Sequence, residues 1–329
     1  MFKQTIMKAA ILHALGETPK HGDFADPIAK NNDEVVITVT AAAVKNLDKG
    51  IASGAHYSSN THAFEPAVVG VDGVGLLPDG TRVYATGITG MIAEKALVNK
   101  TKLVKLPEQI DDITAAALPN AVLGAAAALR FRANVQPGQT VLINGATGVT
   151  GMVAVQIAKY YGAGKVIVTG RNAGSLAKLL ELGADETVSL KQEDQAIIKQ
   201  LQAIHSLTPI DSVIDYLWGH PAELILDALK GKGLATHQLR FITVGGMAGD
   251  NIQLSSGILR SSDIEISGSG FGSLPEETMR KLFAEILPEM LLLAASGKLK
   301  IETVTAALKD IETAWVQDIP AGKRLVIVM

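Results

Sequence analysis

The sequence contains no cysteine among its 329 residues. The chain can therefore form no disulfide, hold no zinc ion through thiolates and use no cysteine as a nucleophile. A chain without cysteine is compatible with a reducing compartment, so we expect a cytoplasmic protein.

A large excess of either charge is also missing, because the formal net charge is −3. This balance gives no electrostatic reason for nucleic acid or an anionic membrane to be the main partner. The two most apolar stretches, residues 115–129 and 282–295, are interrupted by Pro119 and by Glu285 and Pro288, so neither is typical of a membrane span. The first residues hold no apolar run of signal-peptide length. We therefore expect neither membrane insertion nor export.

The length of the chain exceeds that of a usual single core and predicts two domains. Residues 8–106 alternate short β-branched runs with turn clusters, which is typical of a small, mostly antiparallel β-domain. The expected strands are residues 9–12, 35–40, 82–86 and 102–105. No convincing helix is expected there before Asp111.

From about Gln139 the pattern changes to strands that alternate with helices, which predicts βαβ units and a parallel sheet. The expected strands are residues 140–143, 166–169, 186–190, 212–215 and 241–244. Helical spacing of apolar residues marks 149–161 and 175–182. After Ser267 we expect a long helix over 275–296, a β-like segment near Ile301, a short helix and a final strand over 324–328.

The strongest chemical signal is a glycine-rich turn between the first of these strands and the helix after it. Its register is Ala146-x-Gly148-x-x-Gly151, in which alanine still permits the tight turn, Gly148 lets the backbone approach a pyrophosphate, and Gly151 lets the helix pack closely. The N-terminus of the helix offers free N–H groups to phosphates. The turn therefore predicts a dinucleotide site, and the alternative is a strand-to-helix connection without a ligand.

The second strand ends where the reader of the adenosine ribose is expected, and the sequence there is Thr169-Gly170-Arg171-Asn172. No carboxylate is present to bind a free 2′-hydroxyl. The planar guanidinium of Arg171 suits a 2′-phosphate, which favours NADPH over NADH as the cofactor. The alternative is a solvated loop arginine.

Several further motifs occur in one order along nearly the whole chain. They are Met7-Lys8-Ala9, Ser53-Gly54, Gly70-x-Asp72-x-x-Gly75, residues 115–123, residues 135–143, Leu182-Gly183-Ala184-Asp185, Asp211-x-x-x-Asp215, Ser296-Gly297-Lys298-Leu299 and Gly322-Lys323. With the glycine turn, this set resembles the zinc-free, zeta-crystallin-like quinone oxidoreductase branch of the medium-chain dehydrogenases/reductases.

The resemblance implies an α/β chain with a doubly wound Rossmann domain and a GroES-like, mostly antiparallel β-domain. The GroES-like substrate domain would comprise residues 1–122 and 267–329, with the NADPH-binding Rossmann domain at 123–266 between them. Family members commonly form homodimers or tetramers. The implied cofactor-binding residues are Ala146, Thr147, Gly148, Val149, Gly151, Thr169, Gly170, Arg171, Asn172, Val244, Gly245, Gly268, Ser269 and Lys323.

The resemblance also bears on metal. In zinc-using relatives a cysteine near the position of Lys45 and a pair where Val71-Asp72 stands supply the catalytic ligands. Valine cannot coordinate, and the cysteines of the relatives' structural zinc lobe are absent. His56 and His62 lie near each other, but two loop imidazoles without a third ligand make a poor zinc site. We therefore expect no metal.

These expectations predict an NADPH-dependent reduction by hydride transfer. Without a metal to polarise a carbonyl, the small-molecule acceptor should itself be electrophilic, namely a quinone or an enone. The candidate hydrogen-bond donors are Tyr57, Lys45, Asn46 and His56, each of which could instead be a solvated or packing residue. The alternatives are a non-catalytic NADPH-binding or sensing protein, a zinc-free alcohol or aldehyde oxidoreductase, and a lyase or isomerase on the same scaffold.

Overall fold

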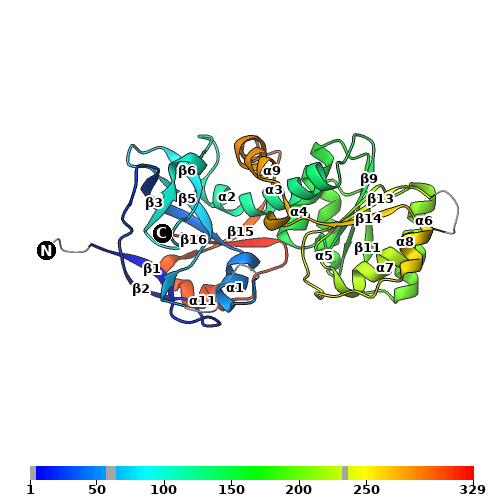
Figure 1. Ribbon diagram of the computed structural model, residues 1–329, viewed down its shortest axis with the longest axis horizontal. Coiled ribbons are helices and arrows are strands. Elements are labelled where there is room, and N and C mark those ends of the chain that lie inside the picture. Colours follow the sequence, from blue (N-terminus) through cyan, green and yellow to red (C-terminus); the bar gives the residue numbers. More distant parts are fainter. Residues whose placement is uncertain (1–4, 57–63, 232–235) are drawn as a thin grey trace. The chain divides into compact units, whose positions relative to one another are not determined.

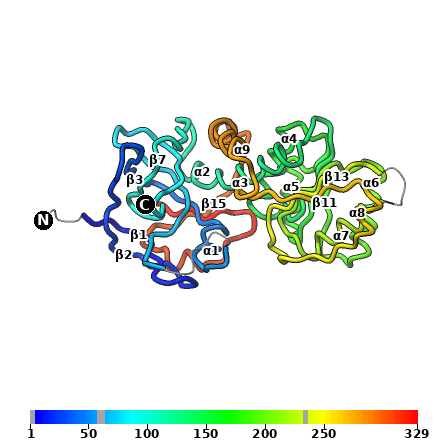
Figure 2. Tube along the Cα trace, viewed as in Figure 1, coloured from blue at the N-terminus to red at the C-terminus, as the bar shows by residue number. Residues whose placement is uncertain are grey.

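The computed structural model describes residues 5–56, 64–231 and 236–329. The chain divides into two compact units, one formed within residues 1–119 and 283–329, here called the β unit, and one formed by residues 120–282, here called the parallel-sheet unit. In Figure 2 the red C-terminal segment returns to the blue N-terminal one, so the β unit is built from both ends of the chain. The first division lies close to the boundary expected after residue 122. The second lies later than the expected one, since residues 267–282 group with the parallel-sheet unit.

The β unit contains two sheets, with strand orders β2-β1-β4 and β15-β16-β3-β5-β6-β8, and β7 also pairs with β3. All pairs are antiparallel except β15 with β16. The strands are β1 (Ile6–Leu12), β2 (Lys20–Ala25), β3 (Glu34–Val44), β4 (Ala67–Val68), β5 (Asp72–Leu76), β6 (Arg82–Thr86), β7 (Lys95–Asn99), β8 (Val104–Lys105), β15 (Glu302–Ala307) and β16 (Lys323–Val328).

Short helices join these strands. They are α1 (Asn46–Ser53), η1 (Lys100–Lys102), α2 (Asp112–Ala117), α10 (Leu287–Ala295), η5 (Leu308–Asp310) and α11 (Ile311–Val316). The helix α1 is one that the sequence patterns did not predict, because it is only 8 residues long and its sequence NLDKGIAS is mostly polar. Buried residues of β1, β3, β7 and β16 form the core of the unit together with Ile311 and Trp315 of α11.

The parallel-sheet unit has one sheet of wholly parallel strands in the order β11-β10-β9-β12-β13-β14 (Figure 1). Its strands are β9 (Thr140–Asn144), β10 (Lys165–Gly170), β11 (Glu186–Ser189), β12 (Ser212–Asp215), β13 (Leu239–Thr243) and β14 (Ile264–Gly268). The central strand β9 is buried along its whole length, as expected for a parallel sheet covered on both faces.

The helices of this unit are α3 (Pro119–Ala126), η2 (Ala127–Arg132), α4 (Val149–Tyr160), α5 (Ala173–Glu181), α6 (Asp194–Leu207), α7 (Gly219–Leu229), α8 (Ser256–Ser261), η3 (Phe271–Ser273) and α9 (Glu276–Lys281). The helices α6 and α7 pack against each other and share a core with Leu142, Val213 and Phe241 of the sheet. The expected long helix 275–296 is a run of α9, the π-helical turn η4 (Leu282–Ile286) and α10.

From β9, the strands β10 and β11 follow toward one edge of the sheet, and β12, β13 and β14 follow toward the other edge. This reversal between β9 and β12 is the topological switch point of a doubly wound sheet, and ligands of such sheets bind at the carboxyl ends of the strands there. The structure thus confirms the predicted fold class, a Rossmann-type sheet domain joined to a mostly antiparallel β-domain.

Candidate functional site

The glycine turn lies at the switch point, directly after β9. Gly145 adopts a φ of 79°, which favours glycine. A Cβ atom added to Gly151 would lie 2.4 Å from Ala146 Cα, so only glycine lets α4 pack this closely on the turn. A Cβ atom added to Gly148 would meet nothing within 4 Å. The backbone at Gly148 therefore borders open space, as a turn that approaches a phosphate requires.

The helix α4 begins immediately after Gly148, which is its N-cap and brings no side-chain hydrogen bond. The helix has 12 residues, and no acidic residue occupies its first turn. Its first N–H groups and its dipole therefore favour an anion beside the turn. Thr147 and Val149, the other predicted residues of the turn, flank Gly148 in the chain.

The end of β10 adjoins the same turn. A Cβ atom on Gly170 would lie 2.2 Å from Thr147 Cγ2, so the glycine permits this close approach. Asn172 caps α5, since its side chain accepts a hydrogen bond from Ser175 N at 2.8 Å. Arg171 lies between them with an exposed side chain. The arrangement places a guanidinium at the carboxyl edge of the sheet, one strand away from the turn.

A buried hydrogen-bond network connects the ends of three strands. Thr169 donates from Oγ1 to Asn144 Oδ1 at 2.5 Å and accepts from Gly145 N at 3.0 Å. Asn144 Nδ2 donates in turn to Asp215 Oδ1 at 2.7 Å. The side chains of Thr169, Asn144 and Asp215 belong to residues with no exposed surface. The network fixes the first residue of the turn to β10 and β12.

Asp215 continues this network into the loop that follows β12. Its carboxylate accepts hydrogen bonds from Leu217 N at 3.0 Å and from Trp218 N at 3.0 and 3.1 Å. Burial raises the pKa of Asp215, and these N–H donors and Asn144 oppose that shift. The carboxylate holds Trp218 at a φ of 54°, which a bulky residue rarely adopts. Asp215 therefore fixes an otherwise unfavourable loop at the edge of the sheet.

That loop in turn supports the loop after β13. Val244 N donates to Asp215 O at 2.7 Å, and Ala248 N donates to Leu217 O at 2.7 Å. Gly245 allows the approach, because a Cβ atom there would lie 2.9 Å from Tyr216 O. The backbone at residues 244–249 is thus held in one conformation by its neighbours.

A cavity of about 340 Å³ lies at the ends of β13 and β14. It includes four of the predicted residues, which are Val244, Gly245, Gly268 and Ser269. Ser269 is 5% exposed, and its buried Oγ has no hydrogen-bond partner among the described residues. Ser269 lines the cavity, so a ligand with polar groups there would lie beside a hydroxyl that the described residues leave unpartnered.

The β unit holds the remaining predicted residues. Lys45 precedes α1 as its N-cap and is 2% exposed. Its ammonium pairs with Asp72 and lies 3.3 Å from Asp48 Oδ2. Tyr84 donates from its hydroxyl to Asp72 Oδ2 at 2.8 Å. Burial by itself would lower the pKa of Lys45, but the carboxylates of Asp48 and Asp72 outweigh it and raise the pKa.

The other predicted residues of the β unit differ from Lys45 in exposure. Asn46 is the first residue of α1 and has an exposed side chain. His56 is partly buried shortly after α1, whereas Tyr57 and His62 lie outside the described residues. Lys323 begins β16 and lies 4.0 Å from Glu302, and both belong to the β unit. The donors and the glycine turn therefore come from different units.

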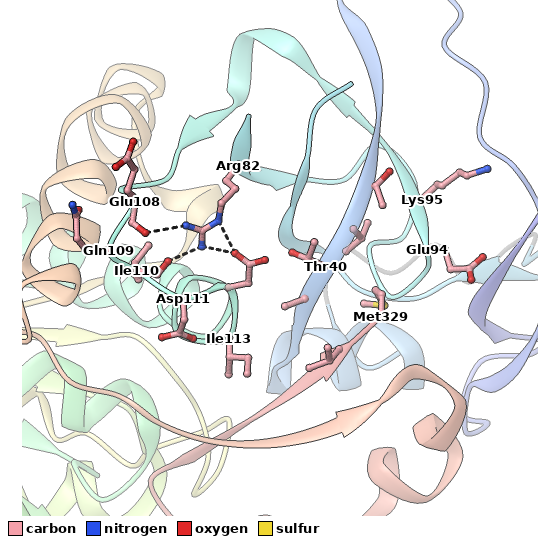
Figure 3. Close-up of a pocket in the computed structure, with 15 residues that line it drawn as sticks. Thr40, Arg82, Glu94, Lys95, Glu108, Gln109, Ile110, Asp111, Ile113 and Met329 are labelled. Carbon is pink, nitrogen blue, oxygen red and sulfur yellow. Dashed lines mark hydrogen bonds and ion pairs between the residues drawn. The ribbon is translucent and has the colours of Figure 1, made fainter. Parts of the chain in front are cut away.

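A larger depression of about 1010 Å³ occurs on the β unit (Figure 3). None of the predicted site residues lines it. Its Arg82 points toward the start of α2, where Nη2 donates to Ile110 O at 2.6 Å just before the helix and Nε donates to Asp112 Oδ1 of its first residue at 2.9 Å. Lys95 pairs with Asp26 at 2.5 Å. Both cations thus have protein partners, and we interpret the depression as structural.

Two features are absent from the described residues. No three His, Asp or Glu side chains there are grouped so that they could hold a metal ion. In the same part of the chain, no helix has the length and apolar character needed to cross a membrane.

The sequence patterns missed three residues of the parallel-sheet unit that shape its edge. Asn144 was counted only as the end of the strand before the turn, and Asp215 only as a strand residue and a member of the Asp211-x-x-x-Asp215 motif, although a polar residue at the last position of a buried strand is a usable signal. Asp250, which lines the cavity after β13, lies in a loop without a motif. Only the folded loop brings its carboxylate to the cavity.

Comparison with known proteins places these features in a family. A family model described as zinc-binding dehydrogenase matches residues 149–287. The chain is 30% identical to the quinone oxidoreductase of Pongo abelii over 285 residues, covering 83% of each chain. A crystal structure of the quinone oxidoreductase from Thermus thermophilus, described also in complex with NADPH, aligns with a TM-score of 0.79 at 26% identity, over 98% of this chain and 100% of that one. A quinone oxidoreductase from Pseudomonas syringae aligns with a TM-score of 0.80 at 25% identity, over 98% and 100%.

Proposed function

This chain belongs to the quinone oxidoreductase family of the medium-chain dehydrogenases/reductases, and from that premise we propose that it reduces a quinone or an enone with NADPH and without a metal. The observation that carries the proposal is the glycine turn at the switch point, open at Gly148 and tightly packed at Gly151. A related protein of the same fold is described in complex with NADPH.

The residues of the parallel-sheet unit fit this cofactor. The turn 145–151 and the N-terminus of α4 would hold the pyrophosphate, because the backbone at Gly148 borders open space and the first turn of α4 holds no acidic residue. Arg171 would bind the 2′-phosphate, since its guanidinium is exposed one strand away. The cavity with the unpartnered hydroxyl of Ser269 would take the nicotinamide. When bound, NADPH supplies the hydride.

The nature of the acceptor follows from the donor set of the chain. No cysteine is present, Val71 cannot coordinate, and the carboxylate of Asp72 is already paired with the ammonium of Lys45. The protein must therefore act through hydrogen-bond donors alone, which suffices for acceptors that are electrophilic by themselves. Asn46, whose side chain is exposed, is one candidate donor, and Tyr57 and His56 are the others. Each would donate to the oxygen that gains charge.

The buried ion pair gives Lys45 a different task from the one expected. Its ammonium cannot reach an acceptor from the interior of the β unit. By capping α1 and pairing with Asp48 and Asp72, it positions Asn46 at the start of the helix. We therefore propose Lys45 as a positioning residue rather than a donor.

The proposal is tested by measuring the loss of the reduced nicotinamide absorbance with purified protein, a chelator and a panel of quinones, enones, aldehydes and alcohols. We expect turnover with quinones or enones that the chelator leaves unchanged. Turnover confined to simple aldehydes or alcohols, or activity abolished by the chelator, would contradict it. Tight NADPH binding without turnover of any acceptor would identify a binding or sensing protein instead. Turnover of an acceptor without net loss of NADPH would identify a lyase or isomerase.

The assembly of the chain is a separate part of the proposal. Because relatives in this family commonly associate, we propose a homodimer or a homotetramer. Sedimentation equilibrium of the purified chain should give a mass of two or four times 34.5 kDa. A mass of one chain at all concentrations would refute this part and leave the proposed reaction standing.

A further inference from the structure

Asp250 follows a loop whose conformation is set by its neighbours. The loop 244–249 is held by hydrogen bonds to the loop after β12, and Gly249 N donates back to Gly246 O at 3.2 Å. A Cβ atom on Gly246 would lie 3.2 Å from Asp250 Oδ1, so the carboxylate lies directly over the backbone of Gly246. The held loop therefore sets the place from which the side chain of Asp250 extends.

That place is the cavity at the ends of β13 and β14. Asp250 is the one charged side chain among the described residues that line it. Its carboxylate makes no hydrogen bond or ion pair within the described ranges 5–56, 64–231 and 236–329. Within those ranges, the fold uses this charge in no structural contact.

The strand register shows which half of a dinucleotide would occupy the cavity. Asn144, Asp215, Thr243 and Gly268 are register partners across β9, β12, β13 and β14, so the cavity is level with the glycine turn. It lies on the opposite side of β9 from β10 and Arg171. Strands are about 4.8 Å apart, so β14 lies about 14 Å from β9. A dinucleotide with its pyrophosphate at the turn and its 2′-phosphate at Arg171 extends its nicotinamide half toward this cavity.

We propose that Asp250 sets the preference of this site between the oxidised and the reduced cofactor, by electrostatic attraction to the positive nicotinamide ring of NADP⁺. The inference rests on the proposed function and goes beyond it. The ring of NADPH is neutral, so the carboxylate distinguishes the two forms through one unit of charge. Stabilising the oxidised form makes the bound NADPH a stronger reductant.

The carboxylate of Asp250 is exposed, so solvent screens its attraction to the ring and limits its effect on the ratio of the two dissociation constants. An exposed charge pair of this kind changes the ratio of two dissociation constants by roughly twofold to fivefold. For a two-electron couple this ratio corresponds to about 9–21 mV of bound cofactor potential. The phosphates of the two forms are alike, so the ratio isolates the charge of the ring.

The test is the ratio of the NADP⁺ to the NADPH dissociation constant, measured by calorimetry for the wild type, Asp250→Asn and Asp250→Glu. We expect Asp250→Asn to raise the ratio by roughly twofold to fivefold, and Asp250→Glu, which keeps the charge, to restore most of it. High salt should shrink the difference. The matched control is Asp263→Asn, which removes the same charge from an exposed residue at the opposite end of β14.

Each outcome decides one question. A ratio that is unchanged in Asp250→Asn, or that rises equally in Asp263→Asn, overturns the role of Asp250. A wild-type protein that binds neither form of the cofactor overturns the proposed function itself. Binding of NADPH with an unaltered ratio leaves the proposed function standing and removes only this inference.

Discussion

Two glycines of the turn predict opposite results for the same substitution. Gly148→Ala places a methyl group in open space, so the fold should tolerate it. Alanine is a poorer N-cap than glycine by roughly 0.5–1 kcal/mol, and the smaller conformational entropy of the unfolded chain offsets about 0.4–1 kcal/mol, so the stability should be nearly unchanged. The methyl group would occupy the space proposed for the pyrophosphate, so NADPH affinity should fall about 10- to 100-fold.

Gly151→Ala should instead damage the fold. Its Cβ atom would lie 2.4 to 2.8 Å from three backbone atoms of Ala146, which cannot move aside cheaply. Overpacking costs about 1–3 kcal/mol and the better helix propensity of alanine offsets up to about 1 kcal/mol, so the middle of these ranges is a net loss of about 1–2 kcal/mol in the free energy of unfolding. In a domain of this size that loss lowers Tm by about 2–8 °C.

Calorimetric unfolding and NADPH titration of both variants separate the two effects. We expect Gly148→Ala to lose binding at an unchanged Tm, and Gly151→Ala to lose Tm. If Gly148→Ala binds NADPH as tightly as the wild type, the backbone there does not approach a pyrophosphate. If Gly151→Ala has the same Tm as the wild type, α4 does not pack on Ala146 as tightly as described.

Three further variants test other parts of the account. Arg171→Ala should weaken NADPH about 10- to 100-fold and leave NADH nearly unchanged, because one charge-assisted hydrogen bond is worth about 1.5–3 kcal/mol; equal losses for both cofactors in titrations would show that Arg171 does not bind the 2′-phosphate. Asp215→Asn should cost about 1–3 kcal/mol of unfolding free energy in denaturant titrations, because an amide N–H₂ replaces an acceptor of several N–H groups. Burial raises the pKa of Asp215 in the folded protein above its value in the unfolded chain. The free energy of unfolding of the wild type should therefore rise relative to that of Asp215→Asn as the pH falls through the folded pKa. A difference in stability between the two proteins that does not depend on pH would contradict this. Lys45→Met should lower the free energy of unfolding by about 3–5 kcal/mol, because it leaves Asp72 buried without its partner. The double variant Lys45→Met/Asp72→Asn should recover part of that loss. A double variant no more stable than the single one would refute the pairing.

The sequence predicted the elements whose signal is local. Five of the six described parallel strands and the helix after the turn were predicted within a few residues, because buried strands are continuous apolar runs and α4 has helical spacing, whereas β14 was not predicted. The open space at Gly148 and the close packing at Gly151 agree with the spacing of the glycine turn.

Other features depend on contacts between distant segments. Lys45 looked like a surface donor because its partner Asp72 is 27 positions away and enters the interior on another strand. Asp215 and Asn144 meet across 71 positions through the strand order of the sheet. The helix α1 is too short and too polar to show a period, and its boundary is set by the buried pairs of its N-cap.

The proposed reaction requires that hydride moves from NADPH to an electrophilic acceptor at one fixed site. The most direct test is the turnover of a quinone with NADPH carrying deuterium at one or the other face of nicotinamide C4. The account predicts that deuterium on one face slows hydride transfer and is lost from the cofactor, while deuterium on the other face is retained in the NADP⁺ that forms. Equal loss of both labels, or no oxidation of NADPH by any quinone or enone, would contradict it.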